Sequence, residues 1–274
     1  MIVTDKRLDW QVGATYTVWG LFDVHLDSVS CELNRLKADI QAIADDPMAR
    51  VIIGGDFNDL TQTGNDPRRQ PSTIPKRLLD RDDYADACVD WNLELLTPIK
   101  DKIDAYLCGN HEDGYERRHG SNVAKVTARL LGVPYVGYES YLRYFLGDGK
   151  TNVTVNGCLY HGAGGNSPVT KGMIGITRNQ TNFRYDFAMS GHIHQQTFGQ
   201  AAVLDVAGTF DNGRVVEKSI CAAICGTYLK TYQAGTTTTY GARGRYAPAA
   251  LGAGRVYIDM KSNVNGRYAV CRIN

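Results

Sequence analysis

Short apolar runs that end in glycine, aspartate or histidine constrain the fold of this chain more than any other feature of its sequence. Residues 15–24 (TYTVWGLFDV), 51–56 (VIIGGD) and 103–109 (IDAYLCG) have the length and pattern of buried strands. Segments with helical spacing of apolar residues separate them, and after about residue 131 strand-like runs predominate. This order predicts an α/β fold, α+β in its second half, with mixed sheets flanked by helices.

No repeat, low-complexity tract or linker divides the 274 residues, so we expect one domain over residues 1–274. A polar insert at about 61–82 is rich in turn formers and contains Arg68 and Arg69. Its basic residues suit a substrate lid, whereas the aspartates among them suit a solvated loop. A strand-rich C-terminal part follows from about residue 195.

Composition excludes several classes of protein. Charged residues make up 22% of the chain and the formal net charge is +1, which excludes a disordered chain and a broad basic surface for nucleic acid. No run approaches the roughly 20 apolar residues of a membrane span, and the first residues lack a secretory pattern. We therefore expect a cytoplasmic protein with no membrane partner. The 7 scattered cysteines favour reduced, buried thiols.

Five of the six histidines lie in short clusters that also contain aspartate, asparagine or glycine. Each cluster follows a predicted strand, and in open α/β sheets the loops beyond the carboxyl ends of strands bind ligands. The clusters are Asp23-Val-His25, Gly55-Asp56-Phe57-Asn58-Asp59, Gly109-Asn110-His111-Glu112, His161-Gly162 and Gly191-His192-Ile193-His194.

These donor types predict a centre of two divalent metal ions. Carboxylate and imidazole suit Mn, Fe, Zn or Co, and the lack of cysteine in the clusters argues against a closed structural zinc site. Residues two apart on an extended segment point to one side, so Asp23 with His25, and His192 with His194, can each converge on one cation. The donors are too many for one tetrahedral ion but suit two ions that share Asp56. Two divalent ions would leave the centre with a net positive charge, which favours an anionic phosphoryl substrate. The candidate ligands are Asp23, His25, Asp56, Asn110, His161, His192 and His194.

The ordered series DVH, GDFND, GNHE, a histidine followed by glycine, and GHIH resembles the calcineurin-like metallophosphoesterase superfamily over residues 23–194. The resemblance implies a four-layer α/β/β/α sandwich, in which two mixed β-sheets are flanked by helices and a dinuclear centre lies at one end. Manganese is the metal that we favour, with iron, zinc, cobalt and magnesium as alternatives. The first ion would be bound by Asp23, His25, Asp56 and His194, and the second by Asp56, Asn110, His161 and His192.

The resemblance also implies a catalytic role for His111, which would face the phosphate as a general acid or stabilise the leaving oxygen without binding metal. Asp59 matches the family position that orients this histidine. The implied reaction is in-line attack on phosphorus by a metal-bound hydroxide, with no covalent enzyme intermediate. Taken singly, each of these residues could equally be a strand-end cap or a core histidine, and it is the ordered set that favours a metal centre.

Departures from other branches of the superfamily narrow the expected substrate. Cys108 precedes GNHE, and Leu60-Thr61 follows GDFND, where protein Ser/Thr phosphatases carry arginines. Glu112 replaces the aspartate usual in the double-strand-break nucleases, and the metal-binding tyrosine of purple acid phosphatases is not evident. The compact phosphoesterases of bacteriophages and bacteria are the most similar in kind. We therefore expect a phosphodiesterase for nucleotides or nucleic acid, phage-encoded and acting in the host cytoplasm; the alternatives are a phosphomonoesterase for a small molecule and a non-catalytic scaffold.

Two further sets of residues are candidate substrate contacts. Arg117 and Arg118 follow GNHE and could reach a phosphate, although a solvated helix start is an equal alternative. Aromatic and basic residues near the C-terminus could stack on a base and hold its phosphate, although a solvated hairpin is an equal alternative. These are Tyr240, Arg243, Arg245 and Tyr246.

Overall fold

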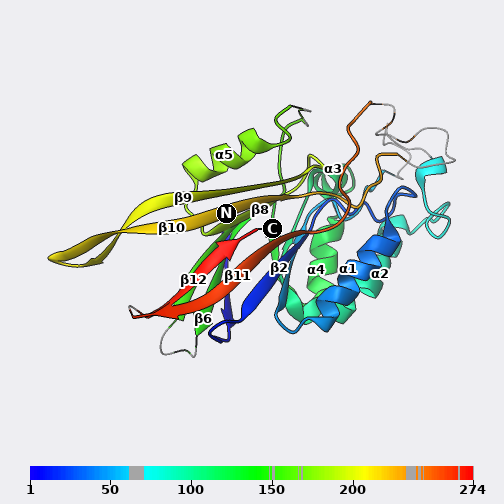
Figure 1. Cartoon of the computed structure of the whole chain (residues 1–274). Helices are drawn as coiled ribbons and strands as arrows, with labels where there is room; N and C mark the ends of the chain where they lie inside the picture. The colour runs from blue at the N-terminus through cyan, green and yellow to red at the C-terminus, as the bar shows by residue number, and fades with distance from the viewer. Residues whose placement is uncertain are drawn as a thin grey trace.

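Two mixed six-stranded sheets form the centre of the protein in a computed structural model (Figure 1). The residues described are 1–61, 71–147, 149, 152–165, 167, 169–232, 239, 242, 244–264 and 266–273, without the side chains of residues 179 and 209. Residues 62–70 of the polar insert, including Arg68 and Arg69, and both Tyr240 and Arg243 therefore lie outside the described residues.

We call the sheets A and B. Sheet A has the order β1 (Ile2–Leu8), β6 (Glu139–Gly147), β7 (Asn152–Tyr160), β8 (Phe187–Ser190), β10 (Asn212–Cys225) and β9 (Gln196–Thr209). Sheet B has the order β12 (Gly266–Arg272), β11 (Gly254–Asn263), β2 (Thr15–Leu21), β3 (Ala49–Gly54), β4 (Ile103–Leu107) and β5 (Tyr135–Gly137). Strands β2 to β5 are parallel, as are β7, β8 and β10.

Five α-helices and two short 3₁₀ segments are seen in the described part of the chain. The α-helices are α1 (Leu33–Asp45), α2 (Tyr84–Leu96), α3 (Asn110–His119), α4 (Val123–Leu131) and α5 (Met173–Asn182). The 3₁₀ segments are η1 (Pro71–Thr73) and η2 (Thr97–Lys102). None of these described helices is long and apolar enough to cross a membrane.

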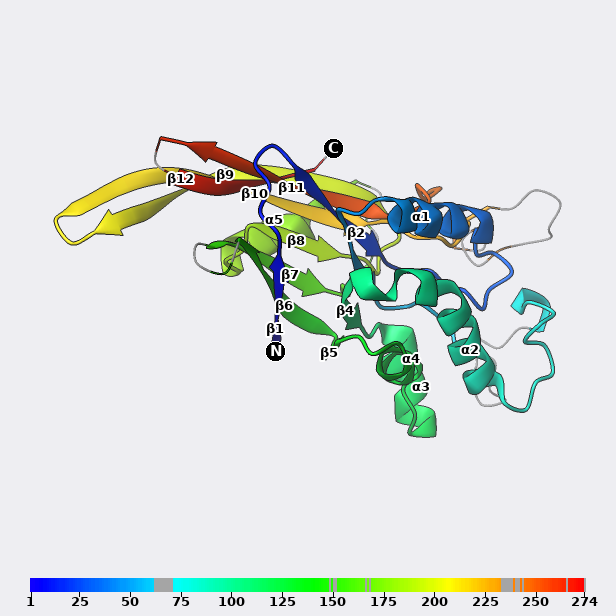
Figure 2. The same cartoon turned by 90° about the horizontal axis from the view of Figure 1, so that it is seen from below.

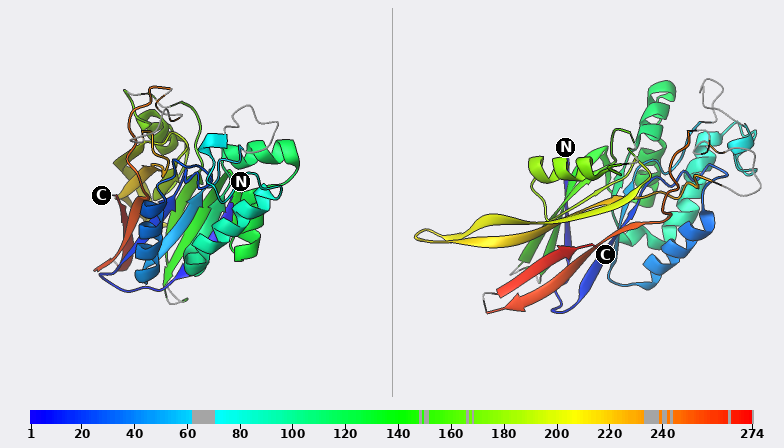
Figure 3. Two further views of the ribbon diagram at one scale, coloured as in Figure 1. Left: turned by 90° about the vertical axis from the view of Figure 1, so that its right-hand side faces the viewer. Right: turned by 45° about the horizontal axis from the view of Figure 1, so that its top comes forward.

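Alternating side chains explain how the sheets and helices pack. In β2, Val18 joins the apolar cluster that both sheets share, whereas its neighbour Trp19 joins the cluster that sheet B shares with α1, α2 and α4. Ile176 of α5 packs in a third cluster against sheet A. Figures 2 and 3 show α1, α2 and α4 grouped on one side, with α5 apart from them. The predicted α/β class, with two mixed sheets flanked by helices, is confirmed.

The hairpin of β9 and β10 projects well beyond the rest of the molecule (Figure 1). These strands pair without a register shift from Gln196 with Cys225 to Thr209 with Asn212. Near the tip of the hairpin, Leu204 and Val206 are exposed because sheet B does not cover that end of the strands.

Candidate metal centre

All five clusters lie just beyond the carboxyl ends of strands. In sheet B, the parallel strands β2, β3 and β4 end immediately before the loops with Asp23, Asp56 and Asn110. In sheet A, β7 and β8 end immediately before His161 and His192. The topology therefore brings the ends of five strands to one edge of the two-sheet core.

Backbone hydrogen bonds join the loops past the strand ends. The N–H of Asp23 donates to the carbonyl of Gly55 at 3.2 Å, and the N–H of His25 donates to that of Asp56 at 3.1 Å. In sheet A, the N–H of Gly191 donates to the carbonyl of His161 at 2.7 Å. The side chains of these loops are thus held in fixed relative positions.

Asp23, His25 and His194 form the first group of candidate ligands. The Nε2 atoms of His25 and His194 are 3.1 Å apart, and Nε2 of His194 lies 3.6 Å from Oδ1 of Asp23. Within the described residues, Oδ1 of Asp23 is buried and has no hydrogen-bond partner. A buried, unpaired oxygen of this kind costs about 1–3 kcal/mol or more, because the group has lost its water. A cation between these three atoms would satisfy it, so the donors present fit a metal ion.

Asp56, His161 and His192 form the second group, and Asn110 lies against it. Nδ1 of His161 bonds to the carbonyl of Gly54 at 2.8 Å, which makes it the donor and leaves Nε2 to face Asp56 Oδ2 at 3.3 Å. Oδ1 of Asn110 lies 3.2 Å from Nε2 of His161 and 2.8 Å from Nδ1 of His192. Because carboxylate and amide oxygens are acceptors, the centre of this group requires protons or a cation.

The two groups are adjacent. Oδ2 of Asp23, in the first group, accepts the backbone N–H of His192, in the second, at 2.7 Å. The structure thus brings together all seven side chains that the sequence nominates, as two neighbouring clusters of buried His and Asp residues that could hold metal ions.

The backbone of these ligands is not extended. The prediction that Asp23 with His25, and His192 with His194, converge because they lie two residues apart on extended segments is therefore wrong in its reason. The φ angles are 49° and 50° at Asp23 and His25, and 71° and 55° at His192 and His194. Asp56 also has a positive φ, of 48°. Non-glycine residues seldom adopt this left-handed conformation, and such strain collects at functional sites.

Two glycines allow the loops to approach this closely. A Cβ atom on Gly109 would lie 2.1 Å from Oδ1 of Asp56, and one on Gly191 would lie 2.3 Å from Oδ2 of Asp23. Any side chain at either position would therefore displace a candidate ligand.

His111 and Asp59 lie beside the first group and form a third one with His25. Nδ1 of His111 bonds to the backbone carbonyl of Asp59 at 2.8 Å, and the N–H of His111 donates to Oδ1 of Asp56 at 2.9 Å. The carboxylate of Asp59 instead contacts Nδ1 of His25, at 2.7 Å, and is 3.6 Å from Nδ1 of His111. The predicted contact between Asp59 and His111 thus exists, but it runs through the peptide carbonyl.

The electrostatics of the centre favour positive charge. Burial alone would lower the pKa of His25, but Asp59 and the other carboxylates raise it to about 10. His161 is similar, because Asp56 outweighs burial and raises the pKa to about 9. In turn, burial would raise the pKa of Asp59, but His25 holds it at about 2. The same carboxylates that favour protonated imidazoles would favour bound cations.

Sequence reasoning missed one structural role in the GNHE motif. Glu112 is buried, and its carboxylate accepts four backbone N–H groups: those of Asp56 and Gly109 at 3.0 and 2.9 Å, and those of Phe57 and Asn58 at 2.8 and 3.3 Å. Because these donors belong to two different ligand loops, Glu112 fixes one loop against the other. Its position in the motif, directly after His111, was the available signal.

The other candidate substrate residues lie at the surface. Arg117, in the last turn of α3, forms an ion pair with Asp113 at 2.5 Å and is exposed. Arg118, Arg245 and Tyr246 are also exposed. Their proposed contacts with a substrate stay predictions.

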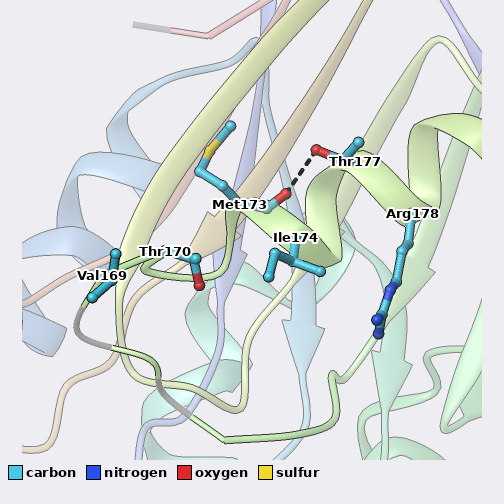
Figure 4. Close-up of a pocket in the computed structure, with 6 residues that line it drawn as sticks. All are labelled: Val169, Thr170, Met173, Ile174, Thr177 and Arg178. Atoms are coloured by element: carbon cyan, nitrogen blue, oxygen red, sulfur yellow. Dashed lines mark hydrogen bonds between the residues drawn. The ribbon is translucent and has the colours of Figure 1, made fainter.

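A depression of about 430 Å³ lies at the start of α5 (Figure 4). One of its walls includes Met173 and Thr177, whose hydroxyl donates to the carbonyl of Met173 at 2.9 Å. None of the nominated ligands lines it, so it is distinct from the candidate metal centre. Its lining residues are Val169, Thr170, Met173, Ile174, Thr177 and Arg178.

The chain matches no protein-family model, and no curated protein matches it.

Proposed function

We propose that this protein is a dinuclear, metal-dependent phosphoesterase of the calcineurin-like metallophosphoesterase superfamily, acting on phosphodiester bonds of nucleotides or nucleic acid. The observation that carries the proposal is the pair of adjacent His/Asp groups, with a buried oxygen on Asp23 that accepts no hydrogen bond from the described residues and with His111 beside them. Imidazole, carboxylate and amide donors in this combination, buried or half-buried, suit manganese, iron, zinc or cobalt.

The residues divide into two ligand sets. Asp23, His25 and His194 would hold one ion, and Asn110, His161 and His192 the other. Asp56 is the bridging candidate, because Oδ2 lies beside His161 while its charge also acts on His25. When bound, the ions would supply Lewis-acid activation of water and neutralise charge on the phosphoryl group.

His111 has the features of a proton donor. The carbonyl of Asp59 accepts a hydrogen bond from Nδ1, so a proton exchanged with a substrate would be carried by Nε2, which lies 3.9 Å from Oδ2 of Asp56. The side chain is 17% exposed, which leaves it accessible while two contacts hold its orientation. Because Nδ1 already carries the hydrogen that Asp59 accepts, Nε2 can donate a proton only from the doubly protonated imidazolium. That donation to the leaving oxygen would offset the negative charge that develops there as the ester bond breaks, and would leave the neutral Nδ1–H ring.

One experiment tests the reaction class and the substrate together. Purified protein is stripped of metal, then loaded with Mn²⁺, Zn²⁺, Fe²⁺ or Mg²⁺ and assayed on bis(p-nitrophenyl) phosphate and p-nitrophenyl phosphate. We expect metal-dependent hydrolysis that is faster on the diester, and at least a 100-fold loss in Asp56→Asn. The matched control is Asp205→Asn, which changes an exposed carboxylate on the projecting hairpin.

The outcomes separate the parts of the proposal. Activity that is absent with every metal, or unchanged in Asp56→Asn, would refute the enzyme and favour a scaffold. Faster hydrolysis of the monoester would leave the reaction class standing and show that the substrate class is wrong.

A further inference from the structure

Buried carboxylates accept the backbone N–H groups of the loop between β3 and the insert. Five consecutive N–H groups, from Asp56 to Leu60, all donate to side-chain carboxylates. The first three donate to Glu112 and the last two to Asp27. Both acceptors are buried, with 1% and 2% exposure respectively.

Asp27 belongs to none of the candidate ligand sets, yet it contacts the loop where that loop meets His25 and His111. Oδ1 accepts the N–H of Asp59, and Oδ2 accepts the N–H of Leu60 at 2.9 Å. The buried hydroxyl of Tyr84, at the start of α2, donates to the same Oδ2. Leu60 has a φ of 51°, so the turn that Asp27 holds is strained as well.

We propose that Asp27 is a positioning residue that acts through Asp59 on both His25 and His111. The proposal rests on the proposed function, because it names the residue that orients the proton donor, His111, and one metal ligand, His25, of the same centre. Asp27 accepts the N–H of Asp59 and the N–H of Leu60, and the Leu60 N–H shares its planar peptide with the carbonyl of Asp59. That carbonyl holds Nδ1 of His111, and the carboxylate of Asp59 holds Nδ1 of His25.

A chain of hydrogen bonds of this kind determines which nitrogen of each ring carries a proton. With Nδ1 of both His25 and His111 committed to Asp59, Nε2 of His25 faces Nε2 of His194 in the first group at 3.1 Å, and Nε2 of His111 faces Oδ2 of Asp56 at 3.9 Å. If the peptide between Asp59 and Leu60 were free to turn, the carbonyl of Asp59 would move away from His111. The carboxylate of Asp59 would then shift from His25. Positioning partners of this kind change metal affinity or activity by about 10–100-fold when they are removed.

The substitution Asp27→Asn tests this, because the amide keeps the size of the side chain but only one of its two terminal atoms can accept. Long-range ¹H–¹⁵N spectra of the imidazoles, taken on metal-free and Zn²⁺-loaded protein, report which nitrogens of each ring carry a proton. The His111 signals are identified by their loss in His111→Ala. We expect the Nδ1–H form of His111 in the natural protein and a mixture of tautomers in Asp27→Asn, with kcat about 10–100-fold lower and KM unchanged.

Tyr84→Phe is the second variant, in case Asp27→Asn does not fold. It removes one of the three hydrogen bonds to Asp27 and leaves both loop bonds, so we expect a smaller change of the same kind in the His111 signals. Its matched control is Tyr144→Phe, which removes a buried hydroxyl that donates to the buried carboxylate of Asp104 at 2.8 Å, near the opposite end of β4. We expect that control to lower stability comparably and to leave the His111 and His25 signals unchanged.

Two results would overturn the positioning role. One is a natural tautomer pattern and natural kcat in a folded Asp27→Asn protein, and the other is equal spectral changes in Tyr84→Phe and Tyr144→Phe. Failure of the proposed function looks different. In that case no phosphoester is hydrolysed by any variant, while the spectra still show whether Asp27 controls the two imidazoles.

Discussion

Asp23 offers a sharp test of the metal centre, because its effect on stability should reverse when metal is added. Without metal, Oδ1 of Asp23 is a buried acceptor with no partner among the described residues, and Oδ2 accepts the N–H of His192. Asn at this position keeps one acceptor for that bond and removes a buried carboxylate oxygen that accepts no hydrogen bond from the described residues. We therefore expect Asp23→Asn to unfold within about 1 kcal/mol of the natural protein in EDTA.

With metal, the natural protein should gain stability and the variant should gain much less. Saturation at 100 times the dissociation constant contributes about 2.7 kcal/mol. For a chain of this length that raises the midpoint of thermal unfolding by about 5 °C, at about 2 °C per kcal/mol. Loss of a ligand should weaken binding at least as much as loss of an outer partner, about 10–100-fold, which at the same metal concentration removes about 1.3–2.3 kcal/mol of that gain.

The assay is thermal unfolding by intrinsic fluorescence, with EDTA and with a concentration series of each cation. Asp205→Asn is the control, since its exposed ion pair with Lys218 contributes little to stability and lies far out on the hairpin. The reasoning fails if no divalent cation at millimolar concentration raises the natural midpoint. It also fails if Asp23→Asn shows the full shift.

Three further predictions concern neighbouring residues. His111→Ala should keep the metal-dependent rise in unfolding midpoint but lose about 10²–10⁴-fold in kcat on bis(p-nitrophenyl) phosphate, and loss of the midpoint rise instead would make His111 a ligand. The pKa values of His25 and His161 are raised to about 10 and about 9, so at neutral pH a metal must displace their protons. Affinity measured by calorimetry should therefore increase roughly tenfold per pH unit for each proton displaced between pH 6 and 8, and a flat profile would contradict this. Asp59→Asn should weaken metal binding about 10–100-fold, because its carboxylate orients His25; unchanged binding with reduced kcat would assign it to His111 alone.

The positions of the candidate ligands could be predicted because they depend on chain order. A parallel strand that ends before a glycine and an aspartate or histidine delivers that side chain to the sheet edge, whichever way the loop then turns. This is why Asp56, Asn110 and His161, which lie far apart in sequence, were nominated together and are found together. The α/β class followed from the same alternation of strands and helices.

Loop conformation could not be predicted in the same way. Period-two reasoning assumed extended backbone at Asp23 and His25, but both residues adopt a left-handed conformation that their own preferences disfavour. Whether Asp59 meets His111 through its carboxylate or its carbonyl depends on the orientation of the Asp59–Leu60 peptide, whose N–H donates to Asp27, outside the motif. No spacing rule relates Asp27 to Leu60, because the two residues are far apart in sequence. The donor is also a backbone N–H, which nearly every residue has, so the sequence does not mark it.

The strained residues and the buried carboxylates have a common explanation. Of the ten non-glycine residues with positive φ in the described chain, five are candidate metal ligands: Asp23, His25, Asp56, His192 and His194. Each such conformation costs on the order of 1–3 kcal/mol unless its surroundings compensate. Glu112 and Asp27 supply such compensation on the β3 side by accepting charge-assisted hydrogen bonds from the strained loop. The ligand geometry on this side is therefore maintained by the protein's own hydrogen bonds, so a metal would bind there without reorganising the loop.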